Sequence, residues 1–163
     1  MTRTLILMRH AKSDWGHAGL ADHDRPLNAR GTRDAPRMGA WLRGKGHLPD
    51  EVLCSTATRT RQTLEGLGLS VPARFIPALY HAEPAAMLET LAEATGQTVL
   101  MLGHNPGIAA FAAALLDRAP DHPRFDDYPT CATLVARFPI DRWEAVTTGQ
   151  GAAVDFAIPA DLP

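Results

Sequence analysis

Arg9 and His10 have side chains that can act on an anionic substrate, and they directly follow the short apolar run Thr4–Met8. A guanidinium stays charged at any working pH and binds phosphate oxygens through parallel N–H groups. An imidazole with a pKa near neutrality can attack as an uncharged nucleophile and later release the group that it has accepted. Arg-His pairs also occur on protein surfaces without a function, so this interpretation needs support from other residues.

His104 follows a second apolar run, Thr98–Leu102, in the motif formed by residues 103–107. Asn105 suits the N-cap of a helix and Pro106 suits its first position, so helix capping explains part of this motif. Capping does not require a histidine just before the cap, and a helix N-terminus is a ready site for an anion. We therefore interpret His104 as a second candidate site residue.

Arg59 lies beyond a third apolar run, Glu51–Cys54, in the first turn of a predicted helix. Ser55 has a side chain that can cap this helix, which would explain Ser55 without any catalytic role. An arginine in a first turn is slightly unfavourable with the helix dipole, and a bound anion would offset this effect. Arg61 points elsewhere on the same helix and is expected to be solvated.

Short apolar runs that alternate with helical periodicity predict an α/β fold in three layers, with a mostly parallel sheet covered by helices on both faces. Two later strands are expected to be partly exposed additions at the sheet edge, with antiparallel pairing left open. The segment Pro120–Thr130 is rich in Pro and Asp and is predicted to be a loop. The predicted strands are Thr4–Met8, Glu51–Cys54, Arg74–Ile76, Thr98–Leu102, Ala132–Phe138 and Ala153–Ile158, and the predicted helices are Ala29–Lys45, Ala57–Leu67, Pro84–Ala94 and Ile108–Leu116.

In this fold class, ligands bind at the carboxyl ends of the strands. Three strand ends deliver the two imidazoles of His10 and His104 and the two guanidiniums of Arg9 and Arg59 to that edge. A dianionic phosphoryl group matches this set of side chains. The residues together therefore predict a site for phosphoryl transfer.

The order and spacing of these motifs resemble the histidine phosphatase superfamily over roughly residues 4–116. The short chain and two of its motifs, Arg9-His10-Ala11-Lys12-Ser13 and Asp24-Arg25-Pro26-Leu27-x-x-x-Gly31, look like the small branch of SixA-like phosphohistidine phosphatases. The other matching motifs are Ser55-x-x-x-Arg59-x-x-Gln62-Thr63 and Gly103-His104-Asn105. The ordered set is much more specific than any one motif alone.

By this resemblance, His10 would attack phosphorus and form a phosphohistidine that water hydrolyses. Arg9, Arg59 and His104 would hold the phosphate oxygens, and no metal or other cofactor would be required. The implied substrate is a phosphohistidine of a protein. The alternatives are a general phosphomonoesterase for small molecules and a phosphate-binding module without catalytic activity, although the nucleophile His10 argues against the last of these.

The proton donor for the leaving group is left unassigned. Larger relatives carry a Glu for this purpose in a long insertion, which this chain lacks. Glu83 and His81 are the nearest equivalents by order, although Glu83-Pro84 also suits a helix start. Asp22 lies in the long polar connection Ser13–Pro26, a candidate substrate lid, and can equally be a solvated loop residue.

Length and composition limit the remaining possibilities. The 163 residues predict a single domain over residues 1–163, with no apolar run long enough to span a membrane. A formal charge of −2, with scattered basic residues, argues against a nucleic-acid partner, and we expect a cytoplasmic location.

Metal binding and disulfide formation are also disfavoured. Cys54 and Cys131 are expected to be reduced core thiols. A metal site is not expected, because the histidines show neither i, i+4 pairs nor Cys/His ligand spacing. These histidines are His17, His23, His47, His81, His104 and His122.

Overall fold

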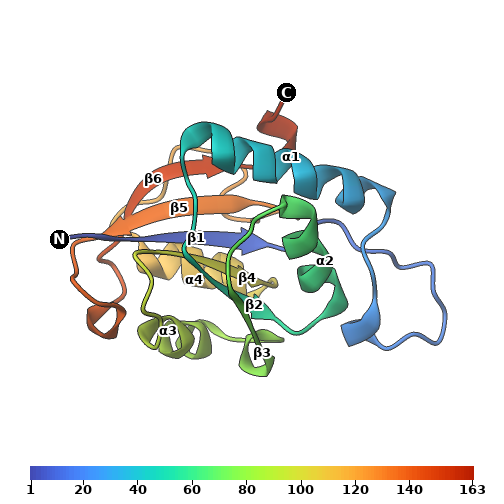
Figure 1. Ribbon diagram of the computed structural model, residues 1–163, viewed down its shortest axis with the longest axis horizontal. Coiled ribbons are helices and arrows are strands. Elements are labelled where there is room, and N and C mark those ends of the chain that lie inside the picture. The colour runs from blue at the N-terminus through green and yellow to red at the C-terminus, as the bar shows by residue number, and fades with distance from the viewer.

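The computed structural model describes residues 1–163, which fold around one sheet of six strands (Figure 1). The strand order is β3-β2-β4-β1-β5-β6, so the first strand of the chain lies inside the sheet. The strands are β1 (Arg3–Arg9), β2 (Glu51–Ser55), β3 (Ala73–Ile76), β4 (Thr98–Gly103), β5 (Thr133–Phe138) and β6 (Ala152–Ala157).

β1 and β4 form the centre of the sheet and are buried along most of their length. They run parallel, with Leu5 opposite Val99 and Arg9 opposite Gly103. β2 and β3 continue the parallel pairing on one side, while β5 pairs antiparallel with β1 and with β6 on the other. A strand with both faces covered needs apolar residues at consecutive positions, which explains the continuous apolar runs in the sequence.

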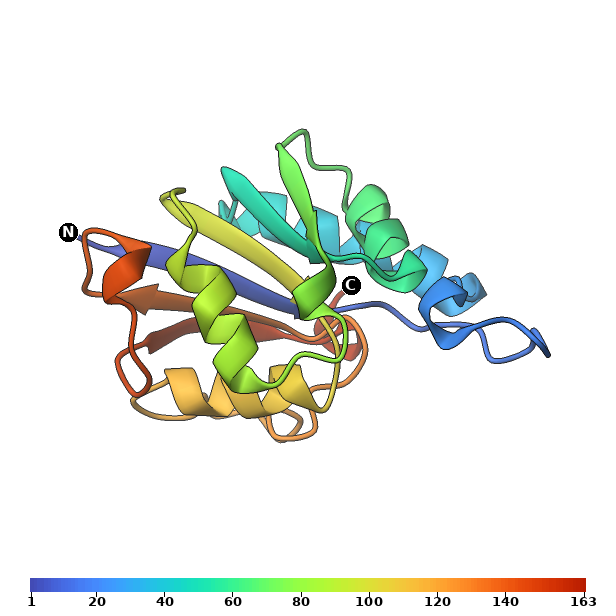
Figure 2. The ribbon, with the colours of Figure 1, turned by 90° about the horizontal axis from the view of Figure 1, so that it is seen from below.

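Four α-helices cover the two faces of the sheet, α1 and α2 on one face and α3 and α4 on the other (Figure 2). Successive residues of β1 point to opposite faces, so Ile6 packs into the core under α1 and α2, and Leu5 into the core under α3 and α4. None of the helices combines the length and apolar character needed to cross a membrane. The helices are α1 (Ala29–Lys45), α2 (Thr58–Leu67), α3 (Pro84–Ala92) and α4 (Gly107–Leu115).

The start of α1 packs directly against the chain that leaves β1. Asn28 caps the helix by accepting a hydrogen bond from the N–H of Gly31 at 2.9 Å, and its own N–H donates to the Lys12 carbonyl at 3.0 Å. Gly31 lies so close to Lys12 that a Cβ would be 2.1 Å from that carbonyl oxygen. Only glycine allows this approach, so α1 helps to fix the segment that follows the first strand.

The predicted α/β class, with a mostly parallel sheet and helices on both faces, is confirmed. The prediction of a partly exposed β5 was wrong, because β5 lies inside the sheet and is largely buried. Phe125 and Tyr128 lie in the predicted loop and pack in the same core as Leu134 of β5. The edge strand on this side is β6, and both late pairings are antiparallel.

Candidate active site

The carboxyl ends of β1 and β4, together with the start of α2 after β2, bring the four predicted site residues together. His10 follows β1 and His104 follows β4, and Arg9 pairs with Gly103, so both histidines leave the sheet at the same level. Their ring centroids are 5.2 Å apart. Arg59 lies in the first turn of α2, close enough for its charge to lower the pKa of both histidines.

His10 is 6% exposed, and its ring is held in one tautomer. Nδ1 lies 2.7 Å from the carbonyl oxygen of Ala11, which can only accept, so Nδ1 carries the proton and Nε2 keeps its lone pair. Burial lowers the pKa of His10 well below its ordinary value, and the nearby His104, Arg9 and Arg59 lower it further, while the Ala11 bond acts in the opposite direction. His10 is therefore an uncharged imidazole with a free nitrogen.

Three buried side-chain nitrogen atoms lack a hydrogen-bond partner, and all three belong to predicted site residues: Arg9 Nε, Arg59 Nε and His104 Nδ1. A buried donor without a partner costs free energy, so such groups are rare in folded proteins unless a ligand satisfies them. Their gathering at one sheet edge is the arrangement expected for a pocket that binds an anion.

The neighbours of His104 determine which of its nitrogen atoms faces the pocket as a donor. Nε2 lies 2.7 Å from the hydroxyl oxygen of Ser55. That oxygen otherwise only accepts, from the N–H of Ala57 at 3.3 Å, so Nε2 is the one acceptor that its own hydrogen meets, and this pairing assigns the ring proton to Nδ1. Burial, and then the charge of Arg59, lowers the pKa of His104 to about 3, which keeps the ring neutral.

Asp22 contacts the site through Arg59. Its carbonyl and its carboxylate accept from Arg59 Nη1 and Nη2 at 2.8 and 3.1 Å. The carboxylate also accepts from the hydroxyl of Tyr80 and from Nε of Arg25. These bonds, led by that of Tyr80, hold the pKa of Asp22 well below its usual range. Asp22 is therefore an ionised carboxylate and cannot serve as a proton donor in this arrangement.

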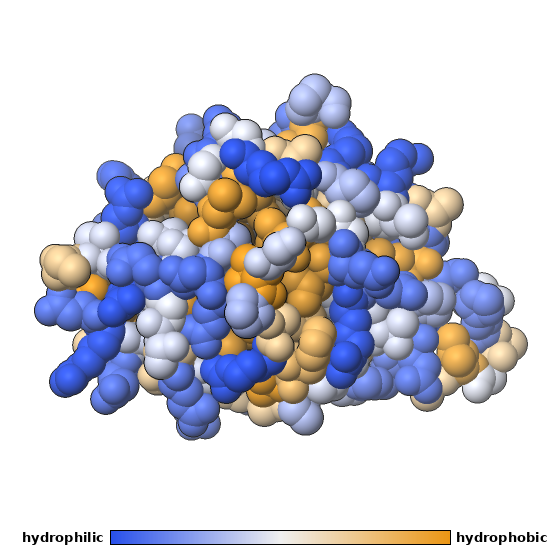
Figure 3. Space-filling view, viewed as in Figure 1, coloured by the Kyte–Doolittle hydropathy of each residue, from blue (hydrophilic) through white to orange (hydrophobic).

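The loop that carries Asp22 is closed at its base by a bridge between Ser13 and Leu27. Inside the loop, the buried guanidinium of Arg25 donates to Ser13 Oγ at 2.8 Å and stacks on the Trp15 ring at 3.5 Å. The loop forms the lobe at the right of Figure 3, where hydrophilic side chains surround some hydrophobic atoms. Trp15 is 72% exposed there, so the lobe presents an aromatic side chain to solvent.

His81 and Glu83, two of the three candidate proton donors, line a cavity of about 320 Å³ that His104 also borders. Both are exposed. The ring of His81 lies 3.9 Å from that of Tyr80, and its backbone φ of 58° lies in the left-handed region, which is unusual for residues other than glycine. Glu83 is the N-cap residue of α3 but makes no capping hydrogen bond with its side chain.

Two predicted helix caps were wrong, each by a small shift along the chain. Ala57 is the N-cap residue of α2, so the hydroxyl of Ser55 is free to bind His104. Pro106 is the N-cap residue of α4, although Asn105 still accepts from the N–H of Ala109 at 3.2 Å. Arg61 is exposed as predicted, and it stacks on Phe75.

Thr63 and Gln62 hold the site together, and sequence reasoning gave neither of them a role. The hydroxyl of Thr63 accepts from the N–H of Ala11 at 3.0 Å and donates to the Arg59 carbonyl at 2.7 Å, which links the two halves of the pocket. Gln62 accepts from the N–H of Leu27 at 2.8 Å, at the base of the loop. The one feature of the sequence that could have indicated these roles is that both residues belong to the Arg59-x-x-Gln62-Thr63 motif.

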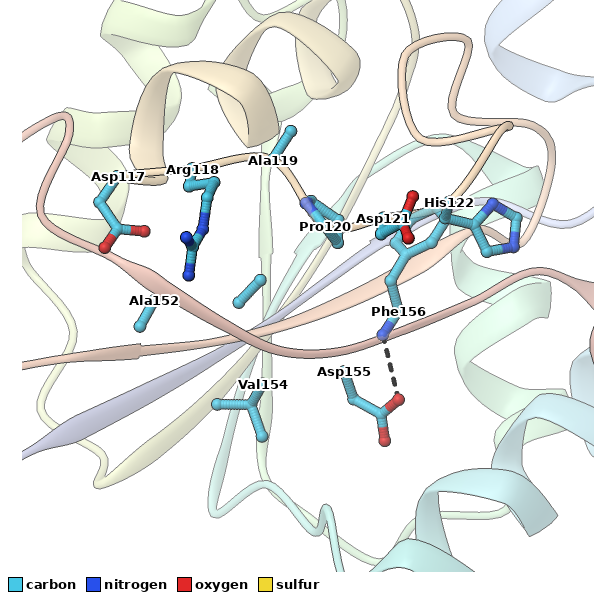
Figure 4. A pocket seen from close by; sticks show the side chains of 11 residues that line it. Asp117, Arg118, Ala119, Pro120, Asp121, His122, Ala152, Val154, Asp155 and Phe156 are labelled. Carbon is cyan, nitrogen blue, oxygen red and sulfur yellow. Dashed lines mark hydrogen bonds between the residues drawn. The ribbon is translucent and has the colours of Figure 1, made fainter.

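A cavity of about 580 Å³ along β6 is lined by none of the four site residues (Figure 4). Its wall combines the opposite charges of Arg118 and Asp155 with small side chains. The Asp155 carboxylate there accepts from the N–H of Phe156 at 3.1 Å, shown as a dashed line.

The structure contains no group of three or more His, Cys, Asp or Glu side chains arranged to hold a metal ion.

The sequence that builds this site is related to a known family. A model of the histidine phosphatase superfamily (branch 1) matches residues 5–82, which include Arg9, His10 and Arg59. The phosphohistidine phosphatase SixA of Escherichia coli (strain K12) is 30% identical over 119 residues, covering 68% of this chain and 73% of that protein. This chain belongs to the histidine phosphatase superfamily.

Other proteins align with this histidine phosphatase over nearly its whole length. An uncharacterised protein of Mycobacterium tuberculosis (strain ATCC 25618 / H37Rv) is 41% identical over 159 residues, which are 93% of this chain and 99% of that protein. A solved structure of a SixA-type protein from Nakamurella multipartitia has a TM-score of 0.84 and 33% identity, covering 98% of this chain and 97% of that one. The superfamily and its SixA-like branch are confirmed, and the enzyme is a phosphatase.

Proposed function

We propose that this histidine phosphatase acts through a phosphohistidine formed on His10. The observation that carries the proposal is the set of three unpaired N–H groups, on Arg9, Arg59 and His104, that accompany a His10 with a free Nε2. The oxygens of a phosphoryl group are acceptors for these donors. Phosphoryl transfer is catalysed mainly by such positioning and by compensation of negative charge.

Two steps complete the proposed reaction. In the first, the lone pair of His10 Nε2 forms a bond to phosphorus, and the bond from phosphorus to the leaving atom breaks as that atom takes up a proton from solvent water. In the second, a water oxygen attacks phosphorus and loses a proton to solvent, the electron pair of the N–P bond returns to Nε2, and inorganic phosphate leaves. The Ala11 carbonyl accepts from Nδ1 throughout, so the ring needs no change of tautomer.

We propose a phosphohistidine side chain of a protein as the substrate. Imidazole leaves phosphorus with less help from an acid than an alkoxide does. This suits a site in which Asp22 is held ionised and both His81 and Glu83 are exposed. The related SixA is named as a phosphohistidine phosphatase, which supports the same substrate class. The alternative, a phosphomonoesterase for small molecules, would use the same pocket with an ester oxygen as leaving atom.

Trapping of the intermediate tests the mechanism. Enzyme mixed with p-nitrophenyl phosphate and quenched in alkaline detergent should carry phosphate on His10, detected by mass spectrometry of its peptides. His10→Ala should carry none and lose turnover by a factor of about 10³ or more. His17→Ala, which changes an exposed loop histidine, should keep both properties. Normal turnover in His10→Ala would refute the mechanism, and phosphate binding by wild type without adduct or turnover would identify a binding module.

The substrate class is tested with two peptides of one sequence, phosphorylated on histidine in the first and on serine in the second. We expect kcat/KM to be higher for the phosphohistidine peptide, because its leaving nitrogen needs less protonation. The reverse order would identify the enzyme as a phosphomonoesterase.

We also propose that no metal ion takes part, since two guanidiniums supply the positive charge that the phosphoryl oxygens need. Dialysed enzyme should have the same activity with EDTA as with added Mg²⁺ or Mn²⁺. A loss of activity in EDTA that one of these metals restores would overturn this proposal.

A further inference from the structure

A cavity of about 410 Å³ lies between the first half of α1 and the chain segments before β5 and after β6. Four arginines line it: Arg30, Arg33 and Arg37 from α1, and Arg124 from the loop before β5. The chain has a formal charge of −2, so this concentration of positive charge is a local feature.

The arginines of the cavity are only partly neutralised. Asp34 accepts from Arg37 at 2.9 Å and lies 3.8 Å from Arg30, while Arg124 pairs with Asp127 at 2.7 Å. Arg33 is exposed and makes no hydrogen bond or ion pair with its side chain. Arg37 and Arg124 each have a close carboxylate partner, so the positive charge of the cavity is carried mainly by Arg30 and Arg33.

Both walls of the cavity adjoin the catalytic segment. On one side, Thr130 precedes Cys131, whose N–H donates to the His10 carbonyl at 2.9 Å. On the other side, the first turn of α1 contacts Lys12, two residues beyond His10. The cavity therefore lies beside the chain segment that carries His10, on the same side of the sheet end as the proposed site.

We propose that the arginine-lined cavity binds acidic side chains of the phosphorylated protein while its phosphoryl group is bound at His10. This inference rests on the proposed function and specifies which protein surfaces the enzyme accepts. The acidic groups would flank the phosphohistidine on the substrate surface.

The exposure of the arginines favours a protein surface over a small anion. The side chains of Arg30 and Arg124 are 56% and 50% exposed. An exposed ion pair contributes at most about 1 kcal/mol, so binding here needs several contacts at once. An acidic surface that carries several carboxylates provides them, whereas a small anion held tightly needs buried donors such as those around His10.

Two phosphohistidine peptides test the proposal, one flanked by Asp and Glu and the other by Asn and Gln at the same positions. Wild type should show a kcat/KM about tenfold higher for the acidic peptide, mostly through KM, and added salt should reduce this preference. Arg30→Gln/Arg33→Glu should abolish it. Gln is used at position 30 to avoid placing a second carboxylate beside Asp34.

The matched control is Arg137→Gln/Arg142→Glu, which makes the same change in charge. Arg137 pairs with Thr4, at the end of the sheet opposite the site, so this variant should keep the preference for the acidic peptide. Equal rates on both peptides in wild type, or an equal loss of preference in the control, would overturn the proposal. Thermal unfolding of both variants shows whether they are folded.

A binding measurement separates this proposal from the proposed function. A fluorescein-labelled, unphosphorylated peptide of six glutamates should bind wild type and the control variant with similar affinity, by fluorescence anisotropy, and bind Arg30→Gln/Arg33→Glu about tenfold more weakly. This result would support the acidic-ligand site even if neither phosphohistidine peptide were hydrolysed. Equal binding by all three proteins would overturn the site while leaving the catalytic mechanism standing.

Discussion

The proposed role of Arg59 depends on a planar guanidinium whose nitrogens are differently occupied. Nη1 and Nη2 donate to Asp22, while Nε is buried and unpaired. An edge of a guanidinium with two parallel N–H groups binds two oxygens of a phosphate side by side. The Arg59 carbonyl accepts from the hydroxyl of Thr63, so the residue is held in place from its backbone as well.

Replacement of this arginine should affect the transition state most. We expect Arg59→Ala to lower kcat/KM by a factor of about 10² to 10³, as for other preorganised donors to a developing anion. Arg61→Ala changes an exposed arginine on the same helix and should lower kcat/KM by less than about threefold. Steady-state kinetics with p-nitrophenyl phosphate measure both, and similar values for the two variants would remove Arg59 from the site.

The gathering of the four predicted site residues at one sheet edge could be predicted because each stands at or just after a strand end or in the first turn of a helix. Their hydrogen-bond partners could not be predicted in this way. Ser55 lies 49 residues from His104, and Thr63 lies 52 residues from Ala11. A contact between such distant positions depends on how the strands are ordered in the sheet, and the capping preference of Ser55 offered a simpler explanation of that residue.

The first turn of helix α1 holds the chain segment that follows the proposed nucleophile, His10. Its contact with Lys12 is made by backbone atoms on both sides, because Gly31 has no side chain to keep them apart. The side chain of Asn28 also holds this turn, by accepting a hydrogen bond from the N–H of Gly31. The placement of α1 therefore sets the path of the chain immediately after His10.

A methyl group at Gly31 should disturb this contact. We expect Gly31→Ala to destabilise the protein by about 1–3 kcal/mol and to lower kcat, because either α1 or residue 12 has to move. Gly44→Ala is the matched control on the same helix, where an added Cβ meets nothing within 4 Å, and it should stabilise the protein by up to about 1 kcal/mol. Urea denaturation and kinetics test both, and a Gly31→Ala variant with unchanged values would refute this account.

The order of helices and strands could be predicted because the inner strands are apolar at consecutive positions. The burial of β5 could not be predicted, because β5 packs against Phe125 and Tyr128. These two residues lie in a loop whose mostly polar composition does not indicate a contribution to the core. The hydroxyl of Tyr128 donates to the Leu7 carbonyl and accepts from the N–H of Leu134. This residue ties the loop to two strands, an arrangement that no local sequence pattern indicates.

For the molecule as a whole, two buried neutral histidines link stability to pH. Burial lowers the pKa of His104 to about 3 and that of His10 well below its ordinary value of 6.5. In the unfolded chain both histidines titrate near their ordinary pKa. At lower pH the unfolded state therefore binds protons that the folded state excludes, and stability falls as the pH drops from 6.5 towards 3.

The contribution of His104 can be measured. In buffers without phosphate, the free energy of unfolding should be measured for wild type and for His104→Gln between about pH 7 and about pH 4.5. As the pH falls, the value for wild type should decrease more steeply than that for His104→Gln, by up to about 1.4 kcal/mol per pH unit. Gln removes the titrating ring and keeps a group that can bond to Ser55. His17→Gln, at an exposed position, should follow wild type. A His104→Gln curve parallel to that of wild type would contradict the linkage.

The contact between Asp22 and Arg59 bears on how the enzyme ends its cycle. Without a bound phosphate, the Asp22 carboxylate accepts a hydrogen bond from Arg59 Nη2. The positive charge of Arg59 is therefore partly neutralised by the protein itself when the pocket is empty. Inorganic phosphate has to compete with this internal anion in order to remain bound. We therefore expect inorganic phosphate to be released more readily, and every phosphorylated ligand to bind less tightly, than in a pocket without this carboxylate.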